Sequence, residues 1–440
     1  MITNIKKELE EEFEFKVSYI DNQGNGVSLS NNKKFLIPGA LKDETVLAQP
    51  MKIINRKVYC KLTKIKFPSN FRIKEDCTKF KTCGGCNFRQ VNNSWLQNWK
   101  LKKLLQKTDS LKIQKKILPM TTLKNNSRRR ATFSANYQNG RLDIGFISRF
   151  QEKIIDLKVC KVLDKNLLRL YDYLKNNLER SIKKNINFKI QINLVDNGSD
   201  IVFDLLKGSF KNIFEIDNLI SDLISESVLR VSFKEGNKIF SFPLHGEVRN
   251  KLGILNNKTI FTFPPPGGFL QPTKSGETEI IKYVLSGIKG SKKVADLFCG
   301  SGTLTIPISE NAKMMCVDSN IDSLSGLKDG LKFHNKIDKS EVIHQNLLHV
   351  PISYQVLNEM DSIVINPPSK GAFRQIKEII KSGVKIIVYV SCNINSFERD
   401  ALILLNNGYE LEWIKPIDQF PNTNHLEIVS KFNMVKSEKI

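Results

Sequence analysis

The stretch Ile386–Asp400, IIVYVSCNINSFERD, decides the fold of the C-terminal part of the chain. Five mostly β-branched residues, Ile386 to Val390, run directly into Ser391, Cys392 and Asn393, and a helical segment follows. An apolar run of this length bounded by small polar residues predicts a buried parallel strand. Because α/β proteins carry their chemistry outside the carboxyl ends of such strands, Cys392 is either a reactive group or one more small buried apolar side chain.

The segments before this stretch repeat the alternation of strand and helix. VADLFCGSGTL predicts a strand, a glycine turn and a helix, MMCVD ends in Asp318, and SIVIN runs into Pro367-Pro368. Ser275 is placed to cap a helix that precedes them. We therefore expect an α/β fold, a doubly wound, Rossmann-like parallel sheet over residues 263–440, entered through the linker FPPPGGF at 263–269.

The length and composition are those of a soluble globular chain. Its 440 residues suffice for two or three domains, and 40% are hydrophobic and 26% charged. No run of eighteen apolar residues predicts a spanning helix, and the first fifteen residues lack the apolar region of a secretory signal. We expect a cytoplasmic protein with no membrane partner.

The net charge of +23 indicates a polyanionic partner. Neutralising phosphates releases counterions and gives affinity that does not depend on sequence. The runs KLKK at 100–103 and SRRR at 127–130 concentrate charge in the N-terminal half. The alternative is a set of basic residues spread over solvated faces.

Residues 1–66 predict a small β-barrel of the kind that binds oligonucleotides. Apolar residues alternate with polar ones in two stretches, at Phe13, Phe15, Val17 and Tyr19 and at Val58, Cys60 and Leu62. The pattern resembles the TRAM module of RNA-modifying enzymes. Cys60 is expected in the barrel core.

Residues 67–262 predict a central α+β domain that carries a cysteine site. Cys77, Cys83 and Cys86 lie in CTKFKTCGGC, and Cys160 is far along the chain. In a reducing compartment such cysteines indicate metal ligation or catalysis, and four thiolates suit structural zinc or a [4Fe–4S] cluster.

Basic and aromatic residues interleave in the same domain, after an amphipathic helix around Leu96–Leu105. The segment from Ser127 to Phe150 contains Arg128, Arg129, Arg130, Arg141, Arg149, Phe133, Tyr137, Phe146 and Phe150. This mixture suits phosphate contacts and base stacking on single-stranded RNA. The alternative is a hairpin with a solvated basic face.

The loop FCGSGT has glycines where a backbone passes close to a ligand, and Asp318 is placed to accept hydrogen bonds from a ribose. Dinucleotide enzymes share this arrangement. Here the loop is not G-x-G-x-x-G, and the NPP on a later strand indicates S-adenosylmethionine instead.

Five segments occur in the order of the bacterial RNA uracil-5-methyltransferases: FLQ with Gln271, DLFCGSGT, NPPSKG, SCN followed by ERD, and HLE with Glu427. The chain resembles the branch of that family with a TRAM barrel and a [4Fe–4S] cluster, which modifies 23S ribosomal RNA. The resemblance covers nearly the whole chain.

The resemblance implies a mechanism. C5 of uracil is a poor nucleophile until the Cys392 thiolate adds to C6; C5 then takes the methyl group, and Glu427 removes the C5 proton so that the cysteine leaves. Without the resemblance Glu427 reads as a solvated surface carboxylate.

The resemblance also implies the binding residues. The cofactor pocket would be lined by Gln271, Phe298, Thr303, Asp318, Asn346 and Asn366, and the cluster would be held by Cys77, Cys83, Cys86 and Cys160. The cluster's role would be structural, because methyl transfer needs no electron.

The chain departs from the family pattern at four positions. Asn366 and Ser369 replace the aspartate and arginine of Asp-Pro-Pro-Arg, and Thr303 and Thr273 stand where asparagine is common. Asn366 still offers an amide oxygen to uracil N3–H, but without charge.

We therefore expect an enzyme that methylates uridine C5, with RNA and no DNA or obligate protein as its partner. Transfer RNA is the alternative substrate, and a non-catalytic RNA-binding or ribosome assembly factor is the alternative class. A redox protein has no flavin or radical motif in its favour.

Overall fold

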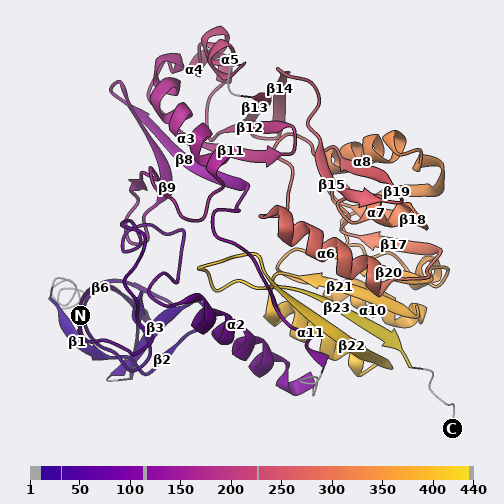
Figure 1. Cartoon of the computed structure of the whole chain (residues 1–440), viewed down its shortest axis with the longest axis horizontal. Coiled ribbons are helices and arrows are strands. Elements are labelled where there is room, and N and C mark those ends of the chain that lie inside the picture. Colours follow the sequence, from indigo (N-terminus) through magenta and orange to yellow (C-terminus); the bar gives the residue numbers. More distant parts are fainter. Residues whose placement is uncertain (1–10, 31, 112–115, 225–226, 436–440) are drawn as a thin grey trace. The chain divides into compact units, whose positions relative to one another are not determined.

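The computed structural model describes residues 11–30, 32–111, 116–224 and 227–435, which form two compact units (Figure 1). Unit 1 contains the described residues up to Lys103, together with Asp143–Lys161 and Phe420–Asn424. Unit 2 contains Leu104–Leu142, Val162–Gln419 and the described residues from His425 onward. Both units are therefore assembled from segments far apart in the sequence.

Unit 1 contains a six-stranded sheet in the order β1-β5-β6-β4-β3-β2. Its strands are β1 (Phe13–Lys16), β2 (Tyr19–Ile20), β3 (Asn25–Ser30), β4 (Lys33–Pro38), β5 (Thr45–Ile54) and β6 (Lys57–Phe67). Phe15, Val17, Val58 and Cys60 are buried together in its core, as the alternating pattern predicted, but Phe13 and Tyr19 of the same pattern are exposed. Helix α2 (Asn93–Thr108) follows, and β9 (Arg141–Ile147) pairs with β10 (Ile154–Ile155).

The middle of the chain supplies a mixed sheet to unit 2. Strands β8 (Arg130–Gln138), β11 (Ile186–Val195), β12 (Gly198–Leu205), β13 (Val228–Glu235) and β14 (Lys238–Pro243) lie in that order. The remaining elements are α3 (Lys165–Asn177), α4 (Phe210–Ile213), α5 (Ile216–Ile224) and the hairpin of β15 (Asn250–Leu255) and β16 (Lys258–Thr262).

The C-terminal part of unit 2 is the predicted α/β sheet. Its strands are β17 (Lys293–Leu297), β18 (Lys313–Asp318), β19 (Ser340–His344), β20 (Ser362–Ile365), β21 (Ile386–Ser391), β22 (Tyr409–Asp418) and β23 (Glu427–Met434), with β7 (Thr121–Thr122) at one edge. Its helices are α6 (Lys274–Gly287), α7 (Thr305–Ser309), α8 (Ile321–Phe333), α9 (Tyr354–Leu357), α10 (Phe373–Ser382) and α11 (Ile394–Leu405).

The strand order is β19-β18-β17-β20-β21-β23-β22-β7, and β17 to β21 are parallel (Figure 1). Ile387 and Tyr389 of β21 pack into one apolar core with α10 and α11, while Val388 and Val390 pack into a second core with α6 to α8. Burial on both faces explains why β21 is a continuous apolar run. The doubly wound sheet is thus confirmed.

Two details differ from the sequence predictions. Helix α6 is capped by Thr273, whose Oγ1 accepts the Gly276 N–H, and not by Ser275. In the basic and aromatic segment, Arg129 and Phe133 are 6% and 1% exposed and cannot serve as surface contacts for RNA. The prediction that these two residues contact RNA was wrong because the residues that bury them lie far along the chain. The partners of Arg129 are described below.

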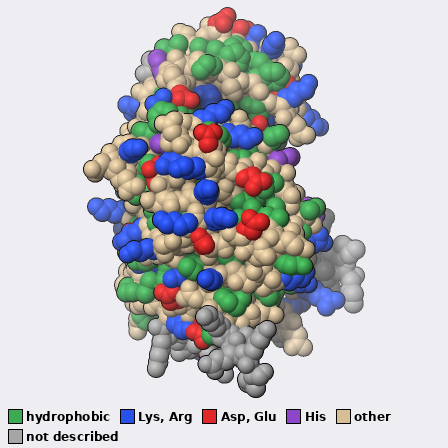
Figure 2. All heavy atoms as spheres, turned by 90° about the vertical axis from the view of Figure 1, so that its right-hand side faces the viewer, with side chains coloured by type: hydrophobic (Ala, Val, Ile, Leu, Met, Phe, Trp, Pro, Cys, Tyr) green, Lys and Arg blue, Asp and Glu red, His purple; other side chains and the backbone are tan. Residues whose placement is uncertain are grey.

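The basic residues do not form a single patch on the face drawn in Figure 2, where Lys and Arg side chains lie scattered among acidic and apolar ones. Within the described part of the chain, no helix is both long and apolar enough to span a membrane.

Candidate active site

Sheet topology brings the predicted site residues of unit 2 to one edge. Phe298 directly follows β17, Asn366 follows β20 and Cys392 follows β21. Asp318 is the last residue of β18, which is parallel to these strands. Strand β23 runs antiparallel to β21, so it begins at the edge where β21 ends. Ligands of open α/β sheets bind at this edge, where the strand order changes direction.

The glycine loop after β17 is built to approach a ligand closely. Gly300 and Gly302 have positive φ angles of 55° and 89°. Phe298 has a φ of 66°, a conformation that residues with a side chain rarely adopt. The Gly300 N–H donates to Asp318 Oδ2 over 2.9 Å. A Cβ built on Gly300 would meet nothing within 4 Å, so this face of the loop is open.

A buried carboxyl group in β17 is hydrogen-bonded to α7, the helix that follows the glycine loop. Asp296 is fully buried, and its Oδ2 accepts the Thr305 hydroxyl over 2.6 Å. Burial raises the pKa of Asp296 to about 7. Among the described residues, Asp296 Oδ1 has no hydrogen-bond partner.

Cys392 and Glu427 are neighbours across two antiparallel strands. The register pairs Ser391 with Ile428, so the next step places Cys392 opposite Glu427. Cys392 is half-buried, and Glu427 is 4% exposed. A pairing between residues 35 positions apart therefore forms a thiol–carboxyl pair at the reactive edge.

Both groups of this pair have shifted pKa values. Burial, and after it the negative charge of Glu427, raise the pKa of the Cys392 thiol to about 11. Burial raises the pKa of Glu427 to about 7, against the opposing effect of a hydrogen bond from Gln419. Glu427 is therefore poised to exchange a proton near neutral pH, as a general base requires.

Gln419, which the sequence interpretation missed, connects Glu427 with Gln271. Its Nε2 donates to Glu427 Oε2 over 2.9 Å and to Gln271 Oε1 over 3.0 Å. Gln419 is 1% exposed and directly follows β22. Gln419 lies in no recognised motif. Its position eight residues before Glu427 is the only sequence feature that could have indicated its role.

The loop after β20 is fastened beside Cys392. Asn366 N–H donates to Leu297 O over 3.2 Å, and Asn393 Nδ2 donates to Ser369 O over 2.8 Å. At the far end of the loop, Asp400 Oδ2 accepts the Ala372 N–H over 2.7 Å. These bonds tie the loop to the end of β17, to Asn393 and to Asp400 of α11.

Two further residues that were predicted to bind the cofactor, Thr303 and Asn346, lie after β17 and β19. Thr303 is half-buried in the glycine loop. Asn346 is exposed after β19, where its Oδ1 accepts the Leu348 N–H over 3.1 Å.

The predicted metal ligands lie together in unit 1. Burial raises the pKa of Cys83, which the charges of Cys160 and Cys77 raise further; burial also raises the pKa of Cys86, with further contributions from Cys160 and Cys83. The four thiols therefore interact electrostatically. Arg89 hydrogen-bonds the Cys86 sulfur, and its positive charge opposes the rise.

The donor set fits thiolate ligation by residue type and by this proximity. Within the described ranges, however, no group of three or more His, Cys, Asp or Glu side chains is arranged to hold a metal ion. All eight cysteines have free thiols.

Comparisons with known proteins agree with this geometry. Residues 352–432 match the family profile "tRNA (Uracil-5-)-methyltransferase", and residues 278–388 match "Methyltransferase small domain". The 23S rRNA (uracil(1939)-C(5))-methyltransferase RlmD of Shewanella sediminis is 27% identical over 98% of both chains. The chain is thus similar to RNA uracil-5-methyltransferases over nearly its whole length.

Two further proteins match this chain over nearly its whole length. An RNA methyltransferase of Mesorhizobium japonicum is 25% identical over 94% of this chain and 97% of its own. The solved tRNA (uracil-54, C5)-methyltransferase of Pyrococcus abyssi, in complex with S-adenosyl-L-homocysteine, shares the fold with a TM-score of 0.70 at 18% identity. It covers 96% of this chain and 100% of its own.

Proposed function

We propose that the protein methylates C5 of a uridine in 23S ribosomal RNA, with S-adenosylmethionine as the methyl donor. The observation that carries the proposal is the Cys392–Glu427 pair beside the open glycine loop. The similarity to RlmD over 98% of both chains supports the choice of ribosomal RNA.

Cys392 performs the first step. Its thiolate adds to C6 of uracil, and the electron pair of the C5=C6 bond moves onto C5 and O4 as an enolate. Because the free thiol has a pKa of about 11, most of it is protonated at neutral pH and must lose its proton as it attacks.

S-adenosylmethionine, when bound, would supply an electrophilic methyl group to C5. The open face of Gly300 and the carboxylate of Asp318 fit a nucleoside, since glycine admits close approach and Asp318 retains lone pairs for ribose hydroxyls. Gln271, Phe298, Thr303, Asn346 and Asn366 complete the proposed pocket.

Glu427 performs the last step. Its carboxylate accepts the proton of C5, the C5–H electrons re-form the C5=C6 bond, and the C6–S bond breaks to release the Cys392 thiolate. A pKa of about 7 leaves a substantial fraction of Glu427 ionised under cytoplasmic conditions.

The N-terminal sheet and the cysteine set complete the proposal. We infer that residues 1–66 act as a TRAM-like RNA-binding barrel and that Cys77, Cys83, Cys86 and Cys160 hold a structural [4Fe–4S] cluster, with zinc as the alternative. The support is the six-stranded sheet and the electrostatic interaction of the four thiols.

Purified protein incubated with S-adenosylmethionine and either 23S ribosomal RNA or transfer RNA tests the proposal. We expect 5-methyluridine in ribosomal RNA by mass spectrometry. Product in transfer RNA alone would reassign the substrate, a choice that the Pyrococcus abyssi structure keeps relevant. No product in either RNA would favour a non-catalytic RNA-binding factor.

A further inference from the structure

Gln419 uses both of its amide hydrogens inside the site. One hydrogen goes to Glu427 Oε2 at 2.9 Å and the other to Gln271 Oε1 at 3.0 Å. All three residues are buried, at 1%, 4% and 6% exposure, so water does not compete for these bonds. We propose that Gln419 is a positioning residue, which holds Glu427 as an ionised carboxylate and fixes it relative to Gln271. This inference rests on the proposed function.

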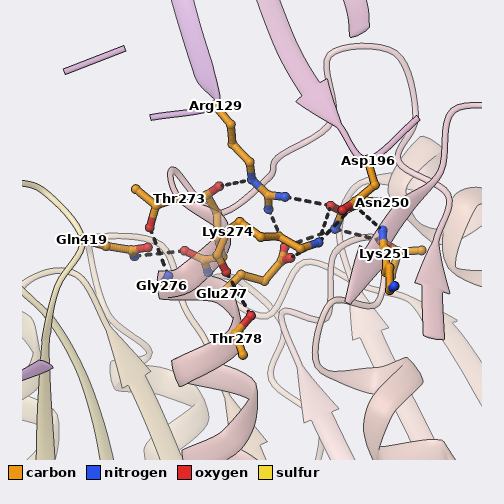
Figure 3. Close-up of polar contacts among 12 residues, drawn as sticks. Arg129, Asp196, Asn250, Lys251, Thr273, Lys274, Gly276, Glu277, Thr278 and Gln419 are labelled. Carbon is orange, nitrogen blue, oxygen red and sulfur yellow. Dashed lines mark hydrogen bonds and ion pairs between the residues drawn. The ribbon is translucent and has the colours of Figure 1, made fainter. Parts of the chain in front are cut away.

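The start of α6 lies against the oxygen of the Gln419 amide, which has no hydrogen-bond partner among the described residues. A Cβ built on Gly276 would lie 2.5 Å from Gln419 Oε1, so this oxygen packs against the first turn of the helix (Figure 3). The positive end of the helix dipole favours an oxygen there. The reversed amide would point Oε1 at two acceptor oxygens, on Glu427 and Gln271, which repel it.

A buried ion pair anchors the other end of the bridge. Arg129 Nε donates to the Gln271 carbonyl over 3.0 Å, and Arg129 Nη2 donates to Glu277 Oε1 over 2.6 Å. Asn250 accepts from Arg129 Nη1 over 2.8 Å, and Lys274 bridges Glu277 to Asp196 (Figure 3). Gln271 is therefore held by a network whose members come from four separate segments of unit 2.

The bridge has a chemical consequence for the last step. A hydrogen bond donated to a carboxylate stabilises its ionised form and lowers its pKa. Gln419 therefore opposes the effect of burial on Glu427 and keeps a larger fraction able to accept the C5 proton. Without Gln419, the pKa of Glu427 would rise, and elimination of Cys392 from the methylated base would slow at neutral pH.

The test is the pH dependence of elimination, measured in a single turnover as decay of the covalent enzyme–RNA adduct. For Gln419→Leu we expect the midpoint of the profile to move up by about one to two pH units, the worth of one hydrogen bond to a charge. Gln419→Glu, which adds a like charge, should move it at least as far. Adduct formation in Gln419→Leu is measured in parallel, so that a change in the first step is separated from a change in elimination.

The matched control is Gln375→Leu. Gln375 is also a buried glutamine of unit 2, but it bonds the backbone of Ile352 and lies on α10, outside the bridge. It should lose stability without moving the midpoint. A wild-type midpoint in both Gln419 variants, or an equal shift in Gln375→Leu, would overturn the inference while 5-methyluridine formation by the wild type still upholds the proposed function. Failure of the wild type to methylate would overturn both.

Discussion

Cys392 and Glu427 face each other where β21 ends and β23 begins, one step beyond the pairing of Ser391 with Ile428. The thiol that would attack C6 and the carboxyl that would deprotonate C5 are thus fixed by the register of one strand pair. A slip of one residue would turn Glu427 to the opposite face of the sheet. The sheet itself therefore sets the geometry of the proposed reaction.

The two pKa values predict that both steps accelerate as pH rises but level off at different pH values. Glu427 must be ionised to accept a proton, so adduct decay should increase as pH rises through about 7 and then level off. Cys392 must lose its proton, so adduct formation should keep increasing toward its pKa of about 11. Rapid-quench measurements of the two steps should separate these profiles; a decay rate that falls as pH rises from about 6 to 8 would contradict the role of Glu427.

Asp400 is predicted to hold the loop beside Cys392. Its Oδ2 accepts the Ala372 N–H and, over 2.8 Å, the Tyr389 hydroxyl. Its Oδ1 accepts from Arg399 Nε over 2.8 Å, so an amide in its place would set N–H groups either against Arg399 or against the two donors at Oδ2. We expect Asp400→Asn to lower the free energy of unfolding by about 2 kcal/mol and to reduce methylation.

The matched control for this change is Asp361→Asn. Asp361 accepts the N–H groups of Lys292 and Lys293 but is exposed and precedes β20, at the opposite end of that strand from the site. It should keep full activity. Equal losses of activity in the two variants would show that Asp400 has no special relation to the loop.

Arg129 is predicted to act through stability and not through RNA contact. Arg129→Ala would remove the buried partner of Glu277 and leave it only the partly exposed Lys274, and breaking a buried pair costs about 3–5 kcal/mol in comparable sites. Arg129→Lys should rescue little, because one ammonium group cannot reproduce the forked contacts to Gln271, Asn250 and Glu277. Denaturant unfolding measures the loss, and the exposed Arg141→Ala of the same segment is the control. Equal stability of Arg129→Ala and wild type would contradict this role.

The cysteine set predicts a bound iron–sulfur cluster. Protein purified anaerobically should contain about four iron atoms per chain and absorb visible light, and Cys86→Ser should lose both. Cys60→Ala, which removes a thiol from the core of the N-terminal sheet, should keep the iron. A colourless protein with one zinc per chain would establish the alternative metal.

Local patterns predicted much of this structure. The apolar run before Cys392 predicted a strand that is buried on both faces of the sheet. The segment FCGSGT, together with Asp318, predicted the glycine turn that follows β17. Such features follow from residues close together in sequence. The amino-acid sequence alone is therefore sufficient to predict them.

Non-local pairings could not be read in this way. The position of Glu427 depends on β23 inserting between β21 and β22, so its local sequence alone resembles a surface carboxylate. In sequence, Arg129 looks like its half-buried neighbours Arg128 and Arg130, because its partner Glu277 is 148 residues away. Gln419 lies in no motif, and its role emerges only from contacts with Gln271 and Glu427.

The most direct test of the central claim traps the intermediate between the two steps. Glu427→Gln, incubated with RNA and S-adenosylmethionine, should form a denaturation-resistant protein–RNA adduct that carries the transferred methyl group. The double variant Cys392→Ala with Glu427→Gln should form none, and Cys392→Ala alone should yield no 5-methyluridine. Normal methylation by Cys392→Ala, or an adduct that persists without Cys392, would contradict the account.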